Sequence, residues 1–296
     1  MARDSGSGST LVRRLLGREL AALRNKAGMP MDEAKAVISV GKQTIWRMET
    51  GQSVRLRAID IAALCKAYGA SPEKTEILLA LCEEAQGKGW WHAYGDTIPK
   101  HFEPFVGLEQ AAERIVTYQS ALIPGLLQTP EYRREVIWTE FPGMETAEVE
   151  RRIELAARRQ DRLTDSRNPL VLEVIMDELS LRRPVGGPSV MSAQLHHILE
   201  ISTLPNVSVR VVPASAGTHP GLLVGTFVLL EFPRHPRAHM TEPPVIFVQG
   251  FTGALYLEKP VEVEQYRDAY TRLQRSALDE DASRRLILEI AEELAR

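Results

Sequence analysis

The chain has 296 residues, of which 44% are hydrophobic and 25% are charged, and its formal net charge is −3. At roughly 100–200 residues per domain, this length corresponds to about two globular domains. The sequence has no run of 18 apolar residues, and its first ten residues, MARDSGSGST, lack the apolar stretch of a secretory signal. We therefore expect no membrane-spanning helix and a cytoplasmic chain, with residues 1–10 forming a flexible arm rich in Gly and Ser.

The charges are distributed unevenly along the chain. Residues 11–57 contain ten Lys and Arg against four Asp and Glu, whereas residues 89–296 contain 22 against 29. A basic segment on an acidic remainder indicates an anionic partner for that segment alone. Chance clustering on a solvated surface would give the same distribution, so charge by itself does not decide between the two.

Five short helices are predicted in residues 11–88, which we interpret as one all-α domain. Leucines at helical spacing form a stripe from Leu11 to Leu23. Ser71 and Pro72 have the residue types of an N-cap and a first helical position. The predicted helices cover residues 11–28, 31–39, 42–50, 56–70 and 72–87.

Residues 31–50 have the parts of a helix-turn-helix. A short helix over 31–38 is followed by a tight turn over 39–41 and by a second helix that starts at Lys42. Ile45 and Met48 are three residues apart, which suits packing residues on one side of that helix. The polar residues then fall on its other side, which must fit lengthwise into a DNA groove about 12 Å wide.

The polar residues of this helix and of the loop after it are the predicted DNA contacts. Gln can bond an adenine edge, Arg or Lys can bond a guanine edge, and Thr can touch a thymine methyl or a phosphate. The loop supplies cations for phosphates. We assign Glu49, which is unusual on a DNA-facing helix, a structural role. The predicted contact residues are Lys42, Gln43, Thr44, Arg47, Arg55 and Arg57. A helix-turn-helix used only for protein contact is the alternative.

The segment IWRMETG, with the polar turn before it, resembles the end of the recognition helix in the lambda-repressor-like XRE family. The resemblance covers about residues 11–70 and implies a five-helix DNA-binding fold. Met31 and Lys35 depart from the family pattern, and so do Gly41, which removes a helix cap, and the bulky Trp46.

Residues 89–106 are predicted to be a junction, in which Trp90 and Trp91 either dock the two parts together or cap the core of the second.

Residues 107–296 are predicted to be an α+β domain with a mixed or antiparallel sheet. A helix or a helix-to-strand transition is expected over 108–118, and Gly250 and Gly253 mark a tight turn within a meander. Predicted helices cover 129–140, 146–164, 189–204, 261–277 and 279–295, and predicted strands cover 169–178, 206–214, 221–232, 244–250 and 253–259.

The apolar stretch over 121–127 is bent at Pro124 and Gly125. Together with Leu126, these residues are our candidates for a cavity or a partner groove, with ordinary core packing as the alternative.

Several segments of this second part are similar to the Scr1-like C-terminal domain of actinobacterial XRE regulators. They include IPGLLQTPEY, RRIELAARRQDRL, RRPVGGPSVMSAQLHHILEI, PNVSVRVVPASAGTHPG, FVLLEF and GALYLE. The resemblance covers roughly residues 90–280. It implies a transcriptional regulator and a small partner protein encoded nearby. Gln249 stands where an acidic residue is expected from the resemblance.

No pattern in the sequence predicts catalysis, a metal or a cofactor. His196 and His197 are adjacent on a predicted helix and face different directions, and His219 is interpreted as a loop residue. HExxH, GxGxxG, Walker-type and GxSxG patterns are absent. Cys65 and Cys82 lie in helical patterns without metal-ligand spacing, so we expect buried, reduced thiols.

We therefore predict a nucleoid-associated, sequence-specific DNA-binding regulator whose C-terminal domain senses a ligand or binds a partner protein. Because one short recognition helix reads only a few bases, we expect a homodimer on a pseudo-palindromic operator of double-stranded DNA. An antitoxin-like or scaffold protein with secondary DNA binding is the alternative, and an enzyme with an attached DNA-targeting domain is a third possibility.

Overall fold

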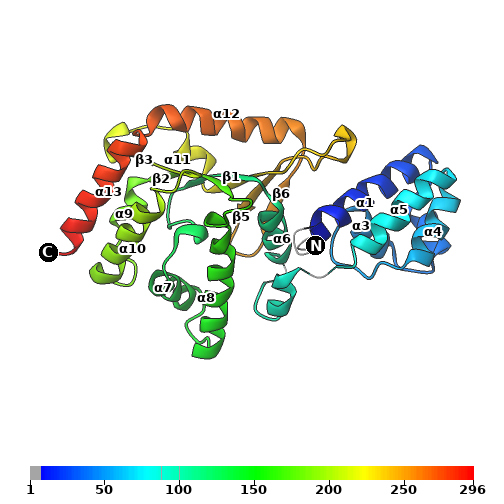
Figure 1. Cartoon of the computed structure of the whole chain (residues 1–296), viewed down its shortest axis with the longest axis horizontal. Coiled ribbons are helices and arrows are strands. Elements are labelled where there is room, and N and C mark those ends of the chain that lie inside the picture. The colour runs from blue at the N-terminus through cyan, green and yellow to red at the C-terminus, as the bar shows by residue number, and fades with distance from the viewer. Residues whose placement is uncertain (1–7, 88, 100) are drawn as a thin grey trace. The chain divides into compact units, whose positions relative to one another are not determined.

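The computed structural model of the chain describes residues 8–87, 89–99 and 101–296, so residues 1–7 of the predicted arm lie outside it. These residues divide into two compact units (Figure 1). The first unit contains the residues up to 93 together with 103–111 and 233–242, and the second contains 94–102, 112–232 and 243–296. An all-α N-terminal part is thus followed by a part with helices and a sheet, as predicted from the sequence.

Each of the five predicted N-terminal helices is present in the first unit. Ser71 caps the fifth, because its hydroxyl accepts a hydrogen bond from the backbone N–H of Lys74 at 3.2 Å. Residues 8–10 belong to the first helix and not to the predicted arm. The helices are α1 (Gly8–Lys26), α2 (Met31–Val37), α3 (Lys42–Glu49), α4 (Ala58–Ala67) and α5 (Pro72–Glu84), followed by the short η1 (Trp90–Tyr94) and by α6 (Glu103–Ala111).

The core of the first unit is built from the apolar stripes of these helices. Its most deeply buried members include Leu16, Leu20, Ile45, Ile61 and Leu78. Burying each such side chain contributes about 1.5–3 kcal/mol.

The two cysteines lie in this same core. Cys65 and Cys82 are buried free thiols, as predicted, and burial raises the pKa of both. A raised thiol pKa keeps the sulfur neutral and unreactive.

The first unit also includes a segment that comes from far along the sequence. Glu242 is buried and accepts hydrogen bonds from Arg14 and, at 2.6 Å, from Arg18, both on α1. Met240 packs against the helical core. The segment 233–242 is therefore attached to α1 by paired charges and by apolar contact.

The second unit is organised around a six-stranded mixed sheet, which is one of the two sheet types that the sequence predicted. Its order is β3-β2-β1-β4-β5-β6. β1, β2 and β3 are parallel to one another, whereas β4, β5 and β6 form the predicted antiparallel meander next to β1. The strands are β1 (Arg114–Gln119), β2 (Val171–Asp177), β3 (Val207–Val212), β4 (Phe227–Glu231), β5 (Val245–Gln249) and β6 (Ala254–Leu257).

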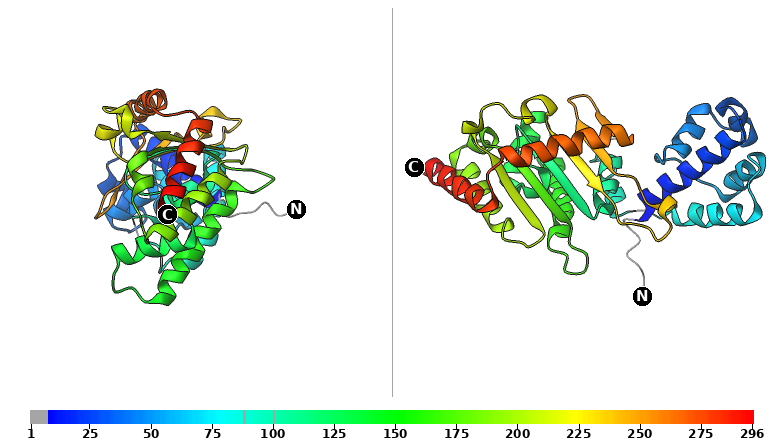
Figure 2. Two further views of the ribbon diagram at one scale, coloured as in Figure 1. Left: turned by 90° about the vertical axis from the view of Figure 1, so that its left-hand side faces the viewer. Right: turned by 90° about the horizontal axis from the view of Figure 1, so that it is seen from above.

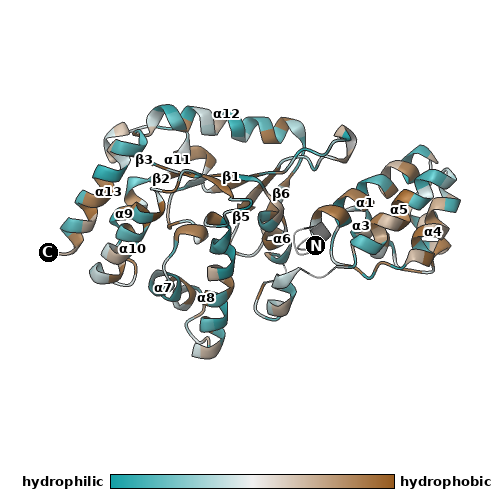
Figure 3. Cartoon of the chain, in the orientation of Figure 1, coloured by the Kyte–Doolittle hydropathy of each residue, from teal (hydrophilic) through white to brown (hydrophobic). Residues whose placement is uncertain are grey.

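Helices lie on both faces of this sheet, with α12 on one face and α7, α8 and α10 on the other (Figures 1 and 2). In the view from above, α12 crosses the strands (Figure 2). The strands are largely hydrophobic, whereas α8 and α12 have long hydrophilic stretches (Figure 3). The longer helices of this unit are α7 (Pro130–Glu140), α8 (Thr146–Gln160), α10 (Pro188–Ile201), α12 (Pro260–Ser276) and α13 (Glu280–Leu294).

One local prediction for this unit was wrong, and one short helix was missed. The segment 221–232, predicted as one strand, is a short helix, α11 (Gly221–Val224), followed by β4. Gly225 separates them in a left-handed conformation with φ of 67°, which interrupts an apolar run that looks continuous in sequence. The short helix α9 (Glu178–Arg182) was not predicted, and the side chain of Asp177 caps it.

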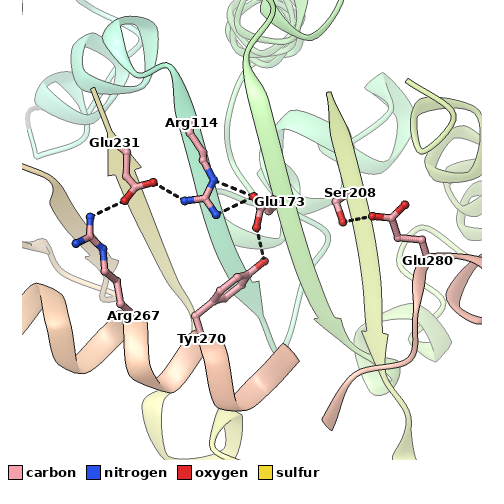
Figure 4. Close-up of polar contacts among 7 residues, drawn as sticks. All are labelled: Arg114, Glu173, Ser208, Glu231, Arg267, Tyr270 and Glu280. Carbon is pink, nitrogen blue, oxygen red and sulfur yellow. Dashed lines mark hydrogen bonds and ion pairs between the residues drawn. The ribbon is translucent and has the colours of Figure 1, made fainter. Parts of the chain in front are cut away.

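The face of the sheet under α12 divides into an apolar and a charged part. Val116, Tyr118 and Ile175 belong to a buried cluster that includes residues of α12. Two residues earlier along β1, on the same face, Arg114 binds Glu173 of β2, with Nε to Oε1 at 2.8 Å (Figure 4).

Two α12 residues complete this charged part. Arg114 also binds Glu231 of β4, and Arg267 of α12 contacts that carboxylate at 2.5 Å (Figure 4). Tyr270 of α12 donates to Glu173 at 3.5 Å. Burial by itself would raise the pKa of Glu231, but Arg114 and Arg267 bring that pKa below its usual value. The charges therefore stabilise one another and attach α12 to the sheet.

The outer edge of β3 is covered by the connection between α12 and α13. The N–H of Val211 donates to the hydroxyl of Ser283 at 3.0 Å, and its carbonyl accepts from the N–H of Leu278 at 2.9 Å. Arg210 donates to the carbonyls of Leu278 at 2.7 Å and of Gln274 at 2.8 Å. This edge is thus protected from pairing with another strand.

Candidate nucleic-acid interface

The turn between α2 and α3 is set by local backbone chemistry. Ser39 has φ of 54°, which is uncommon for a residue with a side chain, and the N–H of Val40 closes the end of α2 on the carbonyl of Lys35 at 3.1 Å. α3 then begins after Gly41, which offers no side chain to cap it. The prediction that Gly41 leaves α3 without a side-chain cap is confirmed.

One side of α3 is fixed in the interior of the first unit. Ile45 and Met48 are buried as predicted, and Glu49 is only 8% exposed. Arg24 of α1 binds Glu49 with Nε to Oε1 at 2.6 Å and a second nitrogen to Oε2 at 2.9 Å. Arg24 also donates to the carbonyl of Met29 at 2.9 Å. Glu49 therefore has the structural role that the sequence suggested, because this bidentate pair holds the end of α3 against α1.

Two glycines allow α1 to approach α3 closely. A Cβ on Gly17 would lie 2.4 Å from the carbonyl oxygen of Met48 and 2.6 Å from that of Glu49. Gly51, which follows α3, has φ of 68°, and a Cβ there would lie 2.6 Å from the Cα of Arg14. We did not single out Gly17 from the sequence, although a glycine inside an amphipathic helix is a known sign of close packing.

The opposite side of α3 faces away from the core. Lys42, Gln43 and Arg47 are exposed, and Thr44 is half-buried. In the part of the chain that the structure describes, the side chains of Gln43 and Arg47 have no hydrogen-bond or ion-pair partner. Trp46 shares this side and is 42% exposed. The residues predicted to point outward from α3 are thus brought together on one accessible face.

Lys42 differs from its neighbours because it has a partner. Its Nζ lies 2.8 Å from Asp32 Oδ2 on α2, and both side chains are more than half exposed. Lys42 and then Lys35 lower the pKa of the Asp32 carboxyl. An exposed pair of this kind contributes little to stability, so Lys42 can exchange Asp32 for another anion at small cost.

The loop after α3 places its two arginines differently. Arg55 is exposed, with no partner among the residues described. Arg57 precedes α4, and its guanidinium binds Asp60 with Nε to Oδ2 at 2.6 Å and a second nitrogen to Oδ1 at 2.8 Å. Asp60 raises the pKa of Arg57 and fixes the position of its guanidinium, and the Arg57 side chain as a whole is half exposed.

Both junction tryptophans belong to the first unit. Trp91 is buried, and it makes an edge contact with Trp90 at 6.1 Å between ring centroids and stacks on His92 at 5.4 Å. A Cβ on Gly89 would collide with the Trp91 ring at 2.3 Å. Their participation in ligand or partner binding stays a prediction.

The bend at Pro124 and Gly125 lies in the second unit, where three glutamines hold it. Gln160 donates to the carbonyl of Gly125 at 3.2 Å, Gln194 donates to that of Leu127 at 2.6 Å, and Gln128 donates to that of Ile123 at 2.7 Å. Pro124 and Leu126 are buried. These bonds satisfy backbone groups that the bend removes from water. A ligand or partner contact at this bend also stays a prediction.

One polar cluster in the second unit joins His219, Asp177 and Tyr118. His219 Nε2 lies 3.5 Å from Asp177 Oδ2, and Tyr118 donates to the same oxygen at 3.4 Å. Burial, and then Asp177, raise the pKa of Tyr118. Within the described ranges, no three His, Cys, Asp or Glu side chains gather closely enough to hold a metal ion. None of the described helices is both long and apolar enough to cross a membrane.

Comparison with protein families adds two matches. A family model described as a helix-turn-helix domain matches residues 15–78. A second model, described as "Domain of unknown function (DUF5753)", matches residues 102–289, which is more than half of the chain. The chain belongs to the DUF5753 family. The helix-turn-helix match includes α2, α3 and the loop described above, and the DUF5753 match includes the whole mixed sheet.

Neither the curated proteins nor the solved structures contain a match to the chain.

Proposed function

We propose that the protein is a sequence-specific DNA-binding transcriptional regulator that reads base edges with the exposed face of α3. The observation that carries this proposal is the division of α3 into a buried side, pinned by Arg24, and an outward side that includes Gln43 and Arg47 without partners in the described part of the chain. Rigid support combined with unpaired donors is what base readout requires. The proposed DNA contacts are Lys42, Gln43, Thr44, Arg47, Arg55 and Arg57.

The proposal divides these residues by task. Gln43 and Arg47 project from the middle of the exposed face and are assigned to base edges. Lys42, Arg55 and Arg57 are assigned to phosphates, because a phosphate needs only a positive charge within reach and carries no sequence information. A helix of eight residues reads only a few bases, so we propose that a homodimer binds two half-sites about 34–36 Å apart.

Selection from a library of random DNA duplexes with the purified full chain tests this function. We expect one enriched motif with two-fold symmetry, and footprinting on the protein's own promoter should protect a copy of it. Raising salt should weaken binding with a slope that reports several neutralised phosphates. Selection with the Gln43→Ala variant should no longer enrich this motif. The matched control is Lys66→Ala, which removes an exposed cation from α4 and should still enrich it. Absence of an enriched sequence would contradict the proposal.

We propose in addition that the DUF5753 domain binds a partner protein. Two exposed leucines on α11 support this, since Leu222 is 63% and Leu223 is 94% exposed. Phe251, at the turn between β5 and β6, is 99% exposed. Large apolar side chains that are exposed next to one another in the chain, as Leu222 and Leu223 are, are typical of interaction surfaces. Scr1-like membership and a small partner encoded nearby are the finer form of this proposal.

Co-purification of the small protein encoded next to this chain tests the partner proposal. The complex should form with the full chain and weaken at least tenfold in the double variant Leu222→Ser, Leu223→Ser. The Leu288→Ser variant, which changes a partly exposed leucine on α13, serves as the matched control. Equal binding by the unaltered protein, the double variant and the Leu288→Ser control would show that α11 is not part of the interface.

A further inference from the structure

The exposed face of α3 contains a large aromatic side chain that none of the polar DNA contacts explains. Trp46 is 42% exposed, whereas Ile45 and Met48 of the same helix are buried. Tryptophan contains one of the largest apolar surfaces of any side chain, and leaving it in water forgoes the free energy of burying that surface. The backbone N–H of Thr50 donates to the carbonyl of Trp46 at 2.9 Å, so the helix is regular at this point.

Helical geometry places Trp46 next to the proposed base-reading residues. At about 100° per residue, Trp46 lies about 60° from Gln43 around the helix, and Arg47 lies about 40° from Gln43 on the other side. Gln43 is thus flanked by an aromatic ring and a guanidinium. The three residues form one outward surface, because the buried Ile45, Met48 and Glu49 occupy the opposite side.

The rise of the helix gives the matching distance along the DNA. Trp46 is three residues after Gln43, which is about 4.5 Å along the helix axis. Successive bases of one DNA strand are about 3.4 Å apart. When Gln43 bonds one base, the Trp46 ring therefore reaches the next base pair or the one after it.

We propose that Trp46 is a specificity-determining residue that reads thymine methyl groups in the major groove. The indole ring contacts the methyl at C5 of a thymine within one or two base pairs of the base that Gln43 reads. The thymine methyl is the apolar group on a base edge in that groove, so it is the chemical partner for an exposed aromatic ring. This inference rests on the proposed function, because it requires α3 to lie in the groove.

Replacing single thymines by deoxyuridine in the selected duplex tests the inference. Deoxyuridine pairs as thymine does and lacks only the methyl group. For the full chain we expect about fourfold weaker binding at one or two positions in each half-site, which corresponds to the loss of one buried methyl-sized group. The Trp46→Ala variant should bind the thymine and deoxyuridine duplexes equally well. The Trp46→Leu variant should keep part of the discrimination, and Ile77→Ala, which shortens a similarly exposed side chain on α5, should keep all of it.

Photochemical cross-linking provides a second readout that does not depend on affinity. With 5-iodouracil at the sensitive position, irradiation should attach the DNA to the tryptic peptide QTIWR, residues 43–47, at Trp46. Cross-linking to another peptide would overturn the inference.

The outcomes separate this inference from the function on which it rests. An enriched duplex whose thymines can all be replaced without loss would overturn the role of Trp46 and leave DNA recognition intact. Trp46→Ala could instead weaken binding to the thymine and deoxyuridine duplexes by the same factor and so keep the preference for thymine. That result would place the ring on the DNA backbone and would also overturn the inference. Failure to enrich any duplex would contradict the proposed function and this inference together.

Discussion

The environment of arginine side chains on the sheet of the second unit is opposite to that on and after α3 of the first unit. In the second unit, Arg114 and Arg267 bind Glu231 on the sheet, so both arginines are neutralised by a carboxylate of the same unit. In the first unit, Arg47 and Arg55 are exposed, and no partner for either side chain occurs in the described ranges. The difference indicates that paired charges support structure here, and that the unpaired ones on and after α3 are available to an external anion.

The first unit contains both kinds of arginine within a short distance along the chain. Arg24 is paired with Glu49 and fixes α3, and Arg47 on the same helix is free to bind. On the proposed function, recognition by α3 therefore depends on a pair that never needs to touch the DNA. The variants below test this dependence, starting with the largest expected effect.

Removing the carboxylate that fixes α3 should have the largest effect. Glu49→Ala leaves the guanidinium of Arg24 buried without its partner, which we expect to destabilise the first unit by about 3 kcal/mol. Urea denaturation followed by circular dichroism measures this as an earlier transition. Glu76→Ala, at an exposed position on α5, is the matched control and should change stability by less than about 0.5 kcal/mol. Equal stability of the two variants would show that the pair does not hold α3.

Adding one methyl group between α1 and α3 should have the next largest effect. Gly17→Ala puts a Cβ against the carbonyl oxygen of Met48, and we expect a loss of about 2 kcal/mol. Faster hydrogen exchange of the α3 amides, measured by mass spectrometry, should accompany this loss. Gly143→Ala makes the same change where no atom lies within 4 Å, and it should leave exchange in α3 unaltered. Unchanged exchange in Gly17→Ala would contradict the close approach of the two helices.

Much of the first unit follows from its sequence because its information is local. Leucine spacing, the Ser71 cap and the glycines after the helices specify five helices without reference to distant residues. The outward position of Gln43 and Arg47 follows from the burial of Ile45 and Met48.

The features missed in the sequence depend on partners far along the chain. The Arg24–Glu49 pair joins residues 25 positions apart, and the closeness of Gly17 to α3 exists only after the helices pack. Parallel pairing of β1 with β2 is likewise set by packing, because an apolar strand can pair in either direction. A continuous apolar run made α11 and β4 look like one strand, although Gly225 separates them in the fold.

The ion pairs of Glu231 with arginines of the second unit should make the stability of that unit depend on pH. The pKa of Glu231 is lowered in the folded chain, so its contribution to stability is complete above the unfolded value of about 4.3 and is lost as the pH falls through the folded value. Glu231→Gln should be less stable by about 1.5 kcal/mol near neutral pH. The two proteins should become equally stable in strong acid. Denaturation between pH 3 and pH 7 measures the difference, and a gap that stays constant with pH would contradict the assignment.

A cap for α3 should give the smallest effect. Gly41→Ser supplies the missing acceptor at a position where a Cβ meets no atom within 4 Å, and the backbone there is already extended. We expect a gain of a few tenths of a kcal/mol, seen as a small rise in Tm. A loss of stability would mean that the start of α3 is not shaped as described.

The most direct test of the central claim is the affinity of Arg47→Ala for its selected duplex compared with an unrelated duplex of the same length. We predict that binding to the selected duplex weakens by about 1–3 kcal/mol, roughly 5- to 150-fold, and that binding to the unrelated duplex changes much less. An equal loss on both duplexes, or no loss on either, would contradict the claim that the exposed face of α3 reads bases.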